Sequence, residues 1–178
     1  YEERYFAAWP SGVDEIWSAP DGQTYPIGAL IFESEDVGQF AFEICEDAFR
    51  GRRPGSLATT AGAELILNPS ASWFSLGKHQ WRREMIQQHS REDICAYLYA
   101  SLRGADNTRL IFDGAGMISC CGTLLAEADR LRADVDVLVT SAHLDLAEVR
   151  RARRETGSWR RQIGADRPTL TRVNIDSL

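Results

Sequence analysis

One cysteine, Cys45, closes an apolar run and is followed at once by two carboxylates. In the stretch FAFEICEDAF, residues 40–49, mostly apolar side chains lead up to this thiol, and Glu46 and Asp47 come directly after it. A thiol at the end of a strand is either a small core residue or a nucleophile held at a strand-to-helix turn. The residue types alone leave both interpretations open.

A cysteine hydrolase needs a thiolate, a proton carrier and donors that face the oxyanion. A helix that begins just after Cys45 would favour the thiolate and would offer the backbone N–H of Glu46 to an oxyanion. The two neighbouring carboxylates disfavour the thiolate, because like charges repel. We therefore expect that a working nucleophile at this position has a cation nearby.

Histidine is the usual proton carrier, and the chain has only His79, His89 and His143. The first two lie on different faces of a predicted helix, and His143 comes late in a predicted strand. Each is more typical of a surface or core histidine than of a catalytic base. No Cys/His cluster has zinc spacing and no glycine-rich loop has a phosphate-binding pattern, so neither a metal site nor a nucleotide site is predicted.

Composition narrows the class of protein. A chain of 178 residues fits one domain, and 44% hydrophobic residues suffice for a sizeable core. The net charge of −6 argues against nucleic acid or an anionic membrane as the main partner. No apolar run approaches the ~20 residues of a membrane span. Four irregularly spaced cysteines do not form a disulfide scaffold, which favours the reducing cytoplasm.

The elements that must position these residues alternate between strands and helices. Strands are predicted over residues 27–33, 37–45, 63–70, 94–102 and 135–145, and helices over 56–62, 78–93 and 146–154. The polar link 34–36 favours a hairpin between the first two strands. Residues 110–128 predict short strands with turns at Asp113-Gly114 and Gly122-Thr123. Hairpins among crossover units predict an α/β fold with a mixed sheet.

Two segments near the C-terminus have simpler interpretations. The tail after Gly157 has mixed polarity and a proline, and we expect it to be an arm or linker. The basic cluster over residues 150–161 is typical of a solvated helix face or a domain-docking surface in a chain of net negative charge.

The stretch FEICEDAF resembles the nucleophile motif of the nitrilase (carbon–nitrogen hydrolase) superfamily. Three further stretches, EERYFAAW, NPSASWFSLGK and GADNTRLIFDGAGMISCCGTLLAEA, resemble the glutaminase domains of glutamine-dependent NAD synthetases. The match covers most of residues 1–150 in the right order. The resemblance implies a nitrilase-like α–β–β–α sandwich, present here as a C-terminal portion of the domain over residues 1–157, with 158–178 as the C-terminal arm or linker. It also implies a homo-oligomer that associates through helix and tail contacts.

The resemblance implies a Glu-Lys-Cys triad in which Cys45 forms a thioester with the side chain of glutamine. The triad glutamate and lysine match no residue of this sequence, and we expect them upstream of Tyr1. The 178-residue segment alone is therefore expected to hydrolyse glutamine negligibly. Lys78 is the only lysine of the chain, but its position matches a different family residue, near the glutamine.

Three residues match positions at which the family contacts glutamine. Lys78 would pair with the substrate α-carboxylate, Ser72 would contact the glutamine, and Glu46 would hold the α-ammonium group. Each has a plainer alternative: a helix-start lysine in a surface ion pair, a turn serine and a helix-capping glutamate. Asp113 and Gly114 match a family turn and are interpreted as structural.

The implied function is glutamine amide hydrolysis that supplies ammonia to an NAD synthetase domain, in the same chain or in a partner. No Ser-Gly-Gly synthetase motif occurs here, so no cofactor is expected in this segment, and ATP and Mg²⁺ would belong to that other domain. Two alternatives stay open: a stand-alone nitrilase-type amidase or carbamoylase, and a non-catalytic subunit of the same fold.

Overall fold

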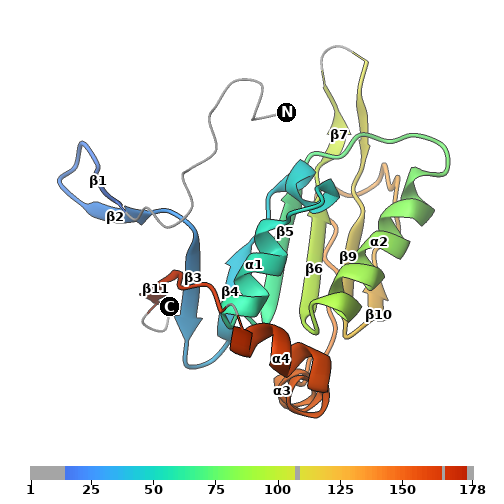
Figure 1. Ribbon diagram of the computed structural model, residues 1–178. Helices are drawn as coiled ribbons and strands as arrows, with labels where there is room; N and C mark the ends of the chain where they lie inside the picture. Colours follow the sequence, from blue (N-terminus) through green and yellow to red (C-terminus); the bar gives the residue numbers. More distant parts are fainter. Residues whose placement is uncertain (1–14, 107–108, 166, 176–178) are drawn as a thin grey trace.

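The computed structural model describes residues 15–106, 109–165 and 167–175, and its centre is a mixed seven-stranded sheet (Figure 1). The strand order is β10-β9-β6-β5-β4-β3-β11. These strands are β3 (Leu30–Ser34), β4 (Gly38–Phe42), β5 (Leu65–Ser70), β6 (Ala96–Ser101), β9 (Gly116–Cys120), β10 (Thr123–Glu127) and β11 (Thr171–Asn174). Separate hairpins join β1 (Glu15–Ser18) to β2 (Thr24–Ile27) and β7 (Arg103–Ala105) to β8 (Ile111–Asp113). The predicted α/β class with a mixed sheet is confirmed, whereas the aromatic stretch 2–9 lies outside the described residues.

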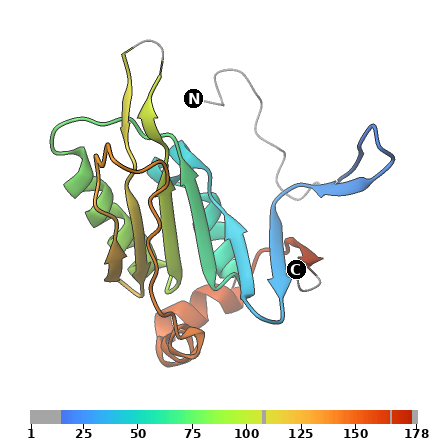
Figure 2. The same ribbon diagram turned by 180° about the vertical axis from the view of Figure 1, so that it is seen from behind.

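The centre of the sheet is formed by β4, β5 and β6, which run parallel to one another. Ala41 pairs with Ile66, and Ile66 pairs with Tyr97. The chain passes from β4 to β5 through α1 (Pro54–Ala61) and from β5 to β6 through α2 (Lys78–Glu92). Both helices cover the same face of the sheet (Figures 1 and 2). Each crossover returns the chain to the edge at which the previous strand began, as parallel pairing requires. All three strands therefore end at the same edge of the sheet.

The residues at the helix ends explain the bounds of α1 and α2. Pro54 is the first residue of α1, where its fixed φ suits the helix. Gly62 ends the helix with φ 130°, a backbone conformation that residues other than glycine rarely adopt. Gly77, at φ 77°, precedes α2. Both predicted helices are confirmed within two residues. Within the part of the chain that the structure describes, no helix is long and apolar enough to cross a membrane.

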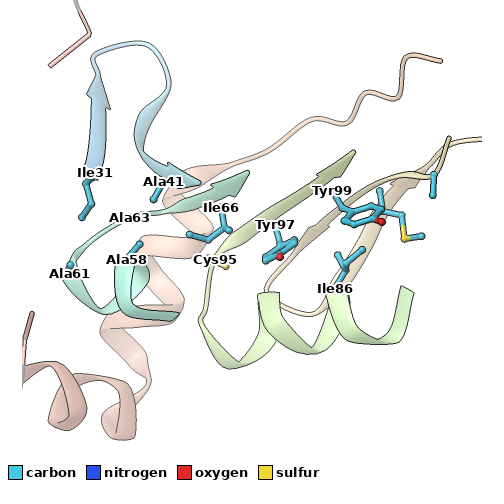
Figure 3. Close-up of a cluster of buried hydrophobic side chains, with 12 residues drawn as sticks. Ile31, Ala41, Ala58, Ala61, Ala63, Ile66, Ile86, Cys95, Tyr97 and Tyr99 are labelled. Atoms are coloured by element: carbon cyan, nitrogen blue, oxygen red, sulfur yellow. The ribbon is translucent and has the colours of Figure 1, made fainter. Parts of the chain in front are cut away.

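The main core lies between these helices and the sheet (Figure 3). Alternate strand residues point to this side, so Tyr97 and Tyr99 lie over Ile86 of α2, while Ala41 and Ile66 lie on the side of α1, which carries the small residue Ala58. Ile66 and Ile86 are fully buried, and burial of one such side chain stabilises the fold by about 1.5–3 kcal/mol. The sheet and this helical layer make up half of the α–β–β–α sandwich that the resemblance implies.

The opposite face of the sheet carries an aromatic cluster of Phe32, Phe40 and Phe42. Phe32 stacks on Phe40 with ring centroids 5.4 Å apart, and Phe42 meets both rings edge to face. Phe42 is 44% exposed. This cluster leaves part of the second face apolar and open to solvent.

The predicted strand over residues 135–145 is wrong. This segment is irregular and crosses the second face of the sheet on its way to α3 (Leu146–Glu155) (Figure 2). Val137 and Val139 are 75% and 87% exposed, so the apolar pattern is not matched by burial. The segment has no strand partner because it lies across the sheet instead of along an edge.

The C-terminal arm contributes regular structure. After α3 come α4 (Gly157–Ala165) and β11, which pairs in parallel with β3 at the edge of the sheet. In the basic cluster, Arg153 donates to the carbonyls of Ile94 and Ala63 at 2.8 and 2.7 Å, and Arg150 forms an ion pair with Glu64. Both arginines therefore attach α3 to the sheet, Arg153 from a half-buried position and Arg150 from the solvated face, where its side chain is 52% exposed.

His89 of α2 gives the fold a pH dependence. Its ring lies 5.8 Å from that of Tyr97, and within the described chain its buried Nδ1 has no hydrogen-bond partner. Burial, together with the charge of Arg53, lowers the pKa of His89 to about 4. The unfolded chain binds this proton with a pKa of about 6.5. The contribution of neutral His89 to the free energy of unfolding is therefore fully present above pH ~6.5 and is lost as the pH falls toward 4.

We predict that the free energy of unfolding of the intact protein falls by roughly 1–2 kcal/mol over this window because of His89, after allowance for solvent screening of a half-buried ring. Urea denaturation at several pH values measures it. The His89→Gln variant lacks the titrating group and serves as the control. If its stability falls with the same slope as that of the wild type, His89 is not the cause.

Candidate active site

The site residues predicted from sequence gather at the edge where the parallel strands end. Cys45 comes three residues after the end of β4, and Ser72 comes two residues after the end of β5. The side chain of Ser101, the last residue of β6, accepts a hydrogen bond from the backbone N–H of Ser72 at 3.3 Å. The carboxyl ends of parallel strands are a common place for binding and catalytic residues, because the loops there converge.

Cys45 lies in a strained turn. After β4, the backbone of Ile44 is extended, and Cys45 then adopts φ 47° in the left-handed region. This conformation is uncommon for residues other than glycine, asparagine and aspartate, and it persists only where the surroundings enforce it. The thiol belongs to a half-buried residue and so is not sealed in the core. The strand-to-turn placement that the sequence predicts is confirmed.

The helix after Cys45 is shorter than the sequence suggests. It is a single 3₁₀ segment, η2 (Cys45–Phe49), with Glu46 and Asp47 in its first turn. A segment of this length has a much smaller dipole than an α-helix, so it favours a thiolate less. Glu46 is exposed. The need for a cation near Cys45 is correspondingly greater.

Ser72 has a buried side chain with an unused hydroxyl. The residue is 3% exposed, and within the described residues its Oγ has no hydrogen-bond partner. Its backbone is fixed, because its N–H donates to Ser101 and the hydroxyl of Ser101 donates back to its carbonyl oxygen. A buried polar group is normally satisfied, so this hydroxyl is available to hydrogen-bond to a ligand or a water molecule.

Lys78 is the first residue of α2, and its Nζ lies 3.7 Å from the centre of the Trp73 ring. This is a close cation–π contact. Burial and the positive charge of Arg82 lower the pKa of Lys78, while Cys45 and Asp113 act in the opposite direction. The structure thus brings Lys78 and Cys45 within electrostatic range of each other. Among the described residues Lys78 has no ion-pair partner, so the surface ion pair considered from sequence is not present there.

The histidines are engaged elsewhere. His79 pairs with Glu127 of β10, and the half-buried ring of His89 lies against Tyr97. His143 lies in the irregular segment before α3. Over the described residues, no hydrogen bond joins a histidine to Cys45.

A family model described as carbon-nitrogen hydrolase matches residues 10–154. The chain belongs to the carbon–nitrogen hydrolase family. The resemblance to the nitrilase superfamily is thereby confirmed.

This carbon–nitrogen hydrolase chain is similar to several proteins named glutamine-dependent NAD(+) synthetase. The Drosophila melanogaster protein is 33% identical over 157 residues, which cover 84% of this chain and 20% of the relative. The Saccharomyces cerevisiae protein is 31% identical over 182 residues, which cover 98% of this chain and 25% of the relative. The crystal structure of the enzyme from Cytophaga hutchinsonii is 34% identical with a TM-score of 0.66, covering 79% of this chain and 22% of that one. The chain thus spans about a fifth to a quarter of the length of these relatives.

Sequence reasoning missed a buried charge network beside the site of this carbon–nitrogen hydrolase. Arg82 of α2 is fully buried and donates two hydrogen bonds to Asp113, at 3.0 and 2.6 Å. Asp113 also accepts from Arg130, and these two arginines outweigh its burial and lower its pKa. The network ties α2 to β8, which agrees with a structural role for Asp113. No sequence signal marks Arg82 as buried, because it lies among polar residues of α2.

A hollow in the described structure lies away from this edge. It has a volume of about 510 Å³, and Glu33, Gln39, Glu64 and Arg150 are among its lining residues. These residues surround the beginning of β4, opposite to the end that leads to Cys45, so the hollow is not part of the candidate site. Across the described residues, no group of three or more His, Cys, Asp or Glu side chains could hold a metal ion.

The four thiols of this carbon–nitrogen hydrolase differ in exposure, which predicts their reactivity. Cys45 and Cys121 are half-buried, whereas Cys95 and Cys120 are buried. Burial raises the pKa of Cys95 well above its ordinary value. Iodoacetamide should therefore modify Cys45 and Cys121 in the native protein about tenfold or more faster than Cys95. Peptide mass spectrometry over a time course measures this, and equal labelling of Cys95 and Cys45 would contradict the described burial.

Proposed function

We propose that this domain hydrolyses the side-chain amide of glutamine with Cys45 as nucleophile. The observation that carries the proposal is the half-buried Cys45 in its strained turn, within electrostatic range of Lys78, at the edge where three parallel strands end. The similarity to glutamine-dependent NAD(+) synthetases supports glutamine as the substrate.

In the proposed reaction, the Cys45 sulfur attacks the amide carbon and forms a tetrahedral intermediate. The carbon–nitrogen bond then breaks, the nitrogen takes up a proton and leaves as ammonia, and the acyl group remains on sulfur as a thioester. Water hydrolyses the thioester to glutamate and free thiol. The proton carrier and the oxyanion lysine would be the triad Glu and Lys that the resemblance places before Tyr1.

Substrate recognition would use the residues around the thiol. The Lys78 ammonium, held on the Trp73 ring, would pair with the α-carboxylate of glutamine. The unused hydroxyl of Ser72 would hydrogen-bond to the substrate, and the exposed carboxylate of Glu46 would meet the α-ammonium group. One cation and one anion near the thiol match the zwitterionic end of an amino acid.

The ammonia would be consumed by an NAD synthetase domain, in the same protein or in a partner. ATP and Mg²⁺ would act in that domain. A homo-oligomeric state, which the resemblance implies, and a cytoplasmic location, which the cysteine usage favours, remain predictions.

We predict that Cys45→Ala abolishes glutamine-dependent NAD formation in the intact protein and leaves ammonia-dependent formation unchanged. Only the first route needs a thioester, and added ammonia reaches the synthetase directly. The variant loses one sulfur from a half-buried residue, so its melting temperature should change little. Parallel assays with glutamine and with ammonium chloride measure both activities.

Cys121→Ala is a matched control for this variant. Cys121 is also half-buried and also has a left-handed backbone, with φ 48° against 47° for Cys45, but it lies at the β9–β10 turn. The Cys121→Ala variant should retain both glutamine-dependent and ammonia-dependent NAD formation. Full glutamine-dependent activity in Cys45→Ala would end the nucleophile proposal and favour a non-catalytic subunit, whereas hydrolysis of other amides but not of glutamine would favour an amidase or carbamoylase.

Lys78→Ala should raise the KM for glutamine by roughly 10–100-fold with little change in kcat, because a contact with the α-carboxylate exists in the ground state and the transition state alike. Lys78→Arg, which keeps the charge, should restore part of the affinity. Arg83→Ala is the control on the same helix, where a half-buried arginine pairs with Glu127. A fall in kcat at unchanged KM would instead give Lys78 a role in the chemical step.

A further inference from the structure

Glu43 is a fully buried carboxylate two residues before Cys45. It follows β4 and continues the alternation of that strand, so it lies on the same side as Ala41, beneath the helices. A buried carboxylate is unfavourable unless its oxygens are hydrogen-bonded. The partners of Glu43 therefore reveal what it holds.

Both carboxylate oxygens of Glu43 bind groups from other elements. Oε1 accepts the backbone N–H of Gly55, in the first turn of α1, at 3.0 Å. Oε2 accepts the hydroxyl of Tyr97, on β6, at 2.6 Å and also faces Arg53 at 3.4 Å. Burial and the negative charge of Glu43 raise the pKa of Tyr97, so its hydroxyl remains a donor.

The backbone of Glu43 is fixed as well. Its N–H donates to the carbonyl of Leu67 at 3.0 Å, and its carbonyl accepts from the buried side chain of Asn68 at 2.7 Å. Arg53 in turn forms an ion pair with Asp93, directly after α2, at 2.6 Å. Gly55 also packs closely against Glu43, because a Cβ at position 55 would lie 2.9 Å from Oε1 of Glu43.

We propose that Glu43 is a positioning residue for Cys45, fixing the strained turn between β4 and η2 to β5, β6 and α1 so that the thiol stays at the substrate edge. The proposal rests on the proposed function of Cys45 and assigns no direct contact with substrate to Glu43.

The physical reason is the strain at Cys45. A residue at φ 47° relaxes unless its neighbours enforce the conformation, and the only buried carboxylate close to it in sequence is bonded on both oxygens. A displacement of the nucleophile by ~1 Å can reduce the rate of the chemical step by about 10²-fold.

Glu43→Gln tests this in the intact protein. The amide has nearly the same shape but only one oxygen, so either Tyr97 or Gly55 then faces an N–H₂ group. We expect a fall in glutamine-dependent kcat of roughly 10–100-fold, a glutamine KM within about twofold of wild type, and unchanged ammonia-dependent activity. The rate of Cys45 alkylation by iodoacetamide, followed by mass spectrometry, should change as well.

Glu64→Gln is the matched control. Glu64 is also a buried glutamate bonded to an arginine, Arg150, but it lies just before β5, at the end of the sheet away from Cys45. The Glu64→Gln substitution should lower the melting temperature without changing glutamine-dependent kcat. Tyr97→Phe should lower glutamine-dependent kcat less than Glu43→Gln does. The double variant should have a kcat only slightly below that of Glu43→Gln, because both changes disrupt one interaction.

Two results would overturn the proposal: wild-type kcat and wild-type Cys45 alkylation in Glu43→Gln, or an equal loss of glutamine-dependent and ammonia-dependent activity in that variant. The alkylation rate needs no glutaminase activity. It therefore decides whether Glu43 positions the thiol even if Cys45→Ala keeps full glutamine-dependent activity and the proposed function fails.

Discussion

Parallel pairing of β4, β5 and β6 is the constraint on which the arrangement of the site depends. Because each connection returns to the same starting edge, every strand delivers its following residues to the opposite edge. Cys45, Ser72 and Ser101 come together for this reason, although 27 and 29 positions separate them along the chain. The two helices that make the crossovers also supply Lys78 and Gly55, a partner of Glu43, so the same connections build both the core and the site.

Buried charge, more than apolar packing, fixes the fine geometry of this edge. Arg82 with Asp113, and Arg53 with Glu43 and Asp93, link helices to strands through bonds that are directional. Removing one partner from such a pair leaves a charge without compensation and typically costs about 3–5 kcal/mol. These pairs therefore tolerate few rearrangements, which suits an edge that has to hold side chains in fixed positions.

Local patterns in the sequence predicted the elements that have local causes. The hairpin of β3 and β4 follows from a polar link between apolar runs, α1 follows from its closing residue Gly62, and α2 follows from the periodicity of residues 78–93. The segment 135–145 was mistaken for a strand, since an apolar run does not show whether a neighbouring strand is available. The roles of Glu43 and Arg82 depend on partners from distant parts of the chain, so no local pattern marks them.

The attachment of the C-terminal arm has a consequence for the order of folding. β11 pairs with β3, and Arg172 meets Glu33 across 139 positions of sequence, the longest loop closure among the described side-chain contacts. Contacts that close long loops form late, because the chain entropy must first be lost. During synthesis the side of β3 that faces away from β4 remains unpaired until the arm has left the ribosome. An interruption before residue 171 would leave that edge open to pairing with other chains.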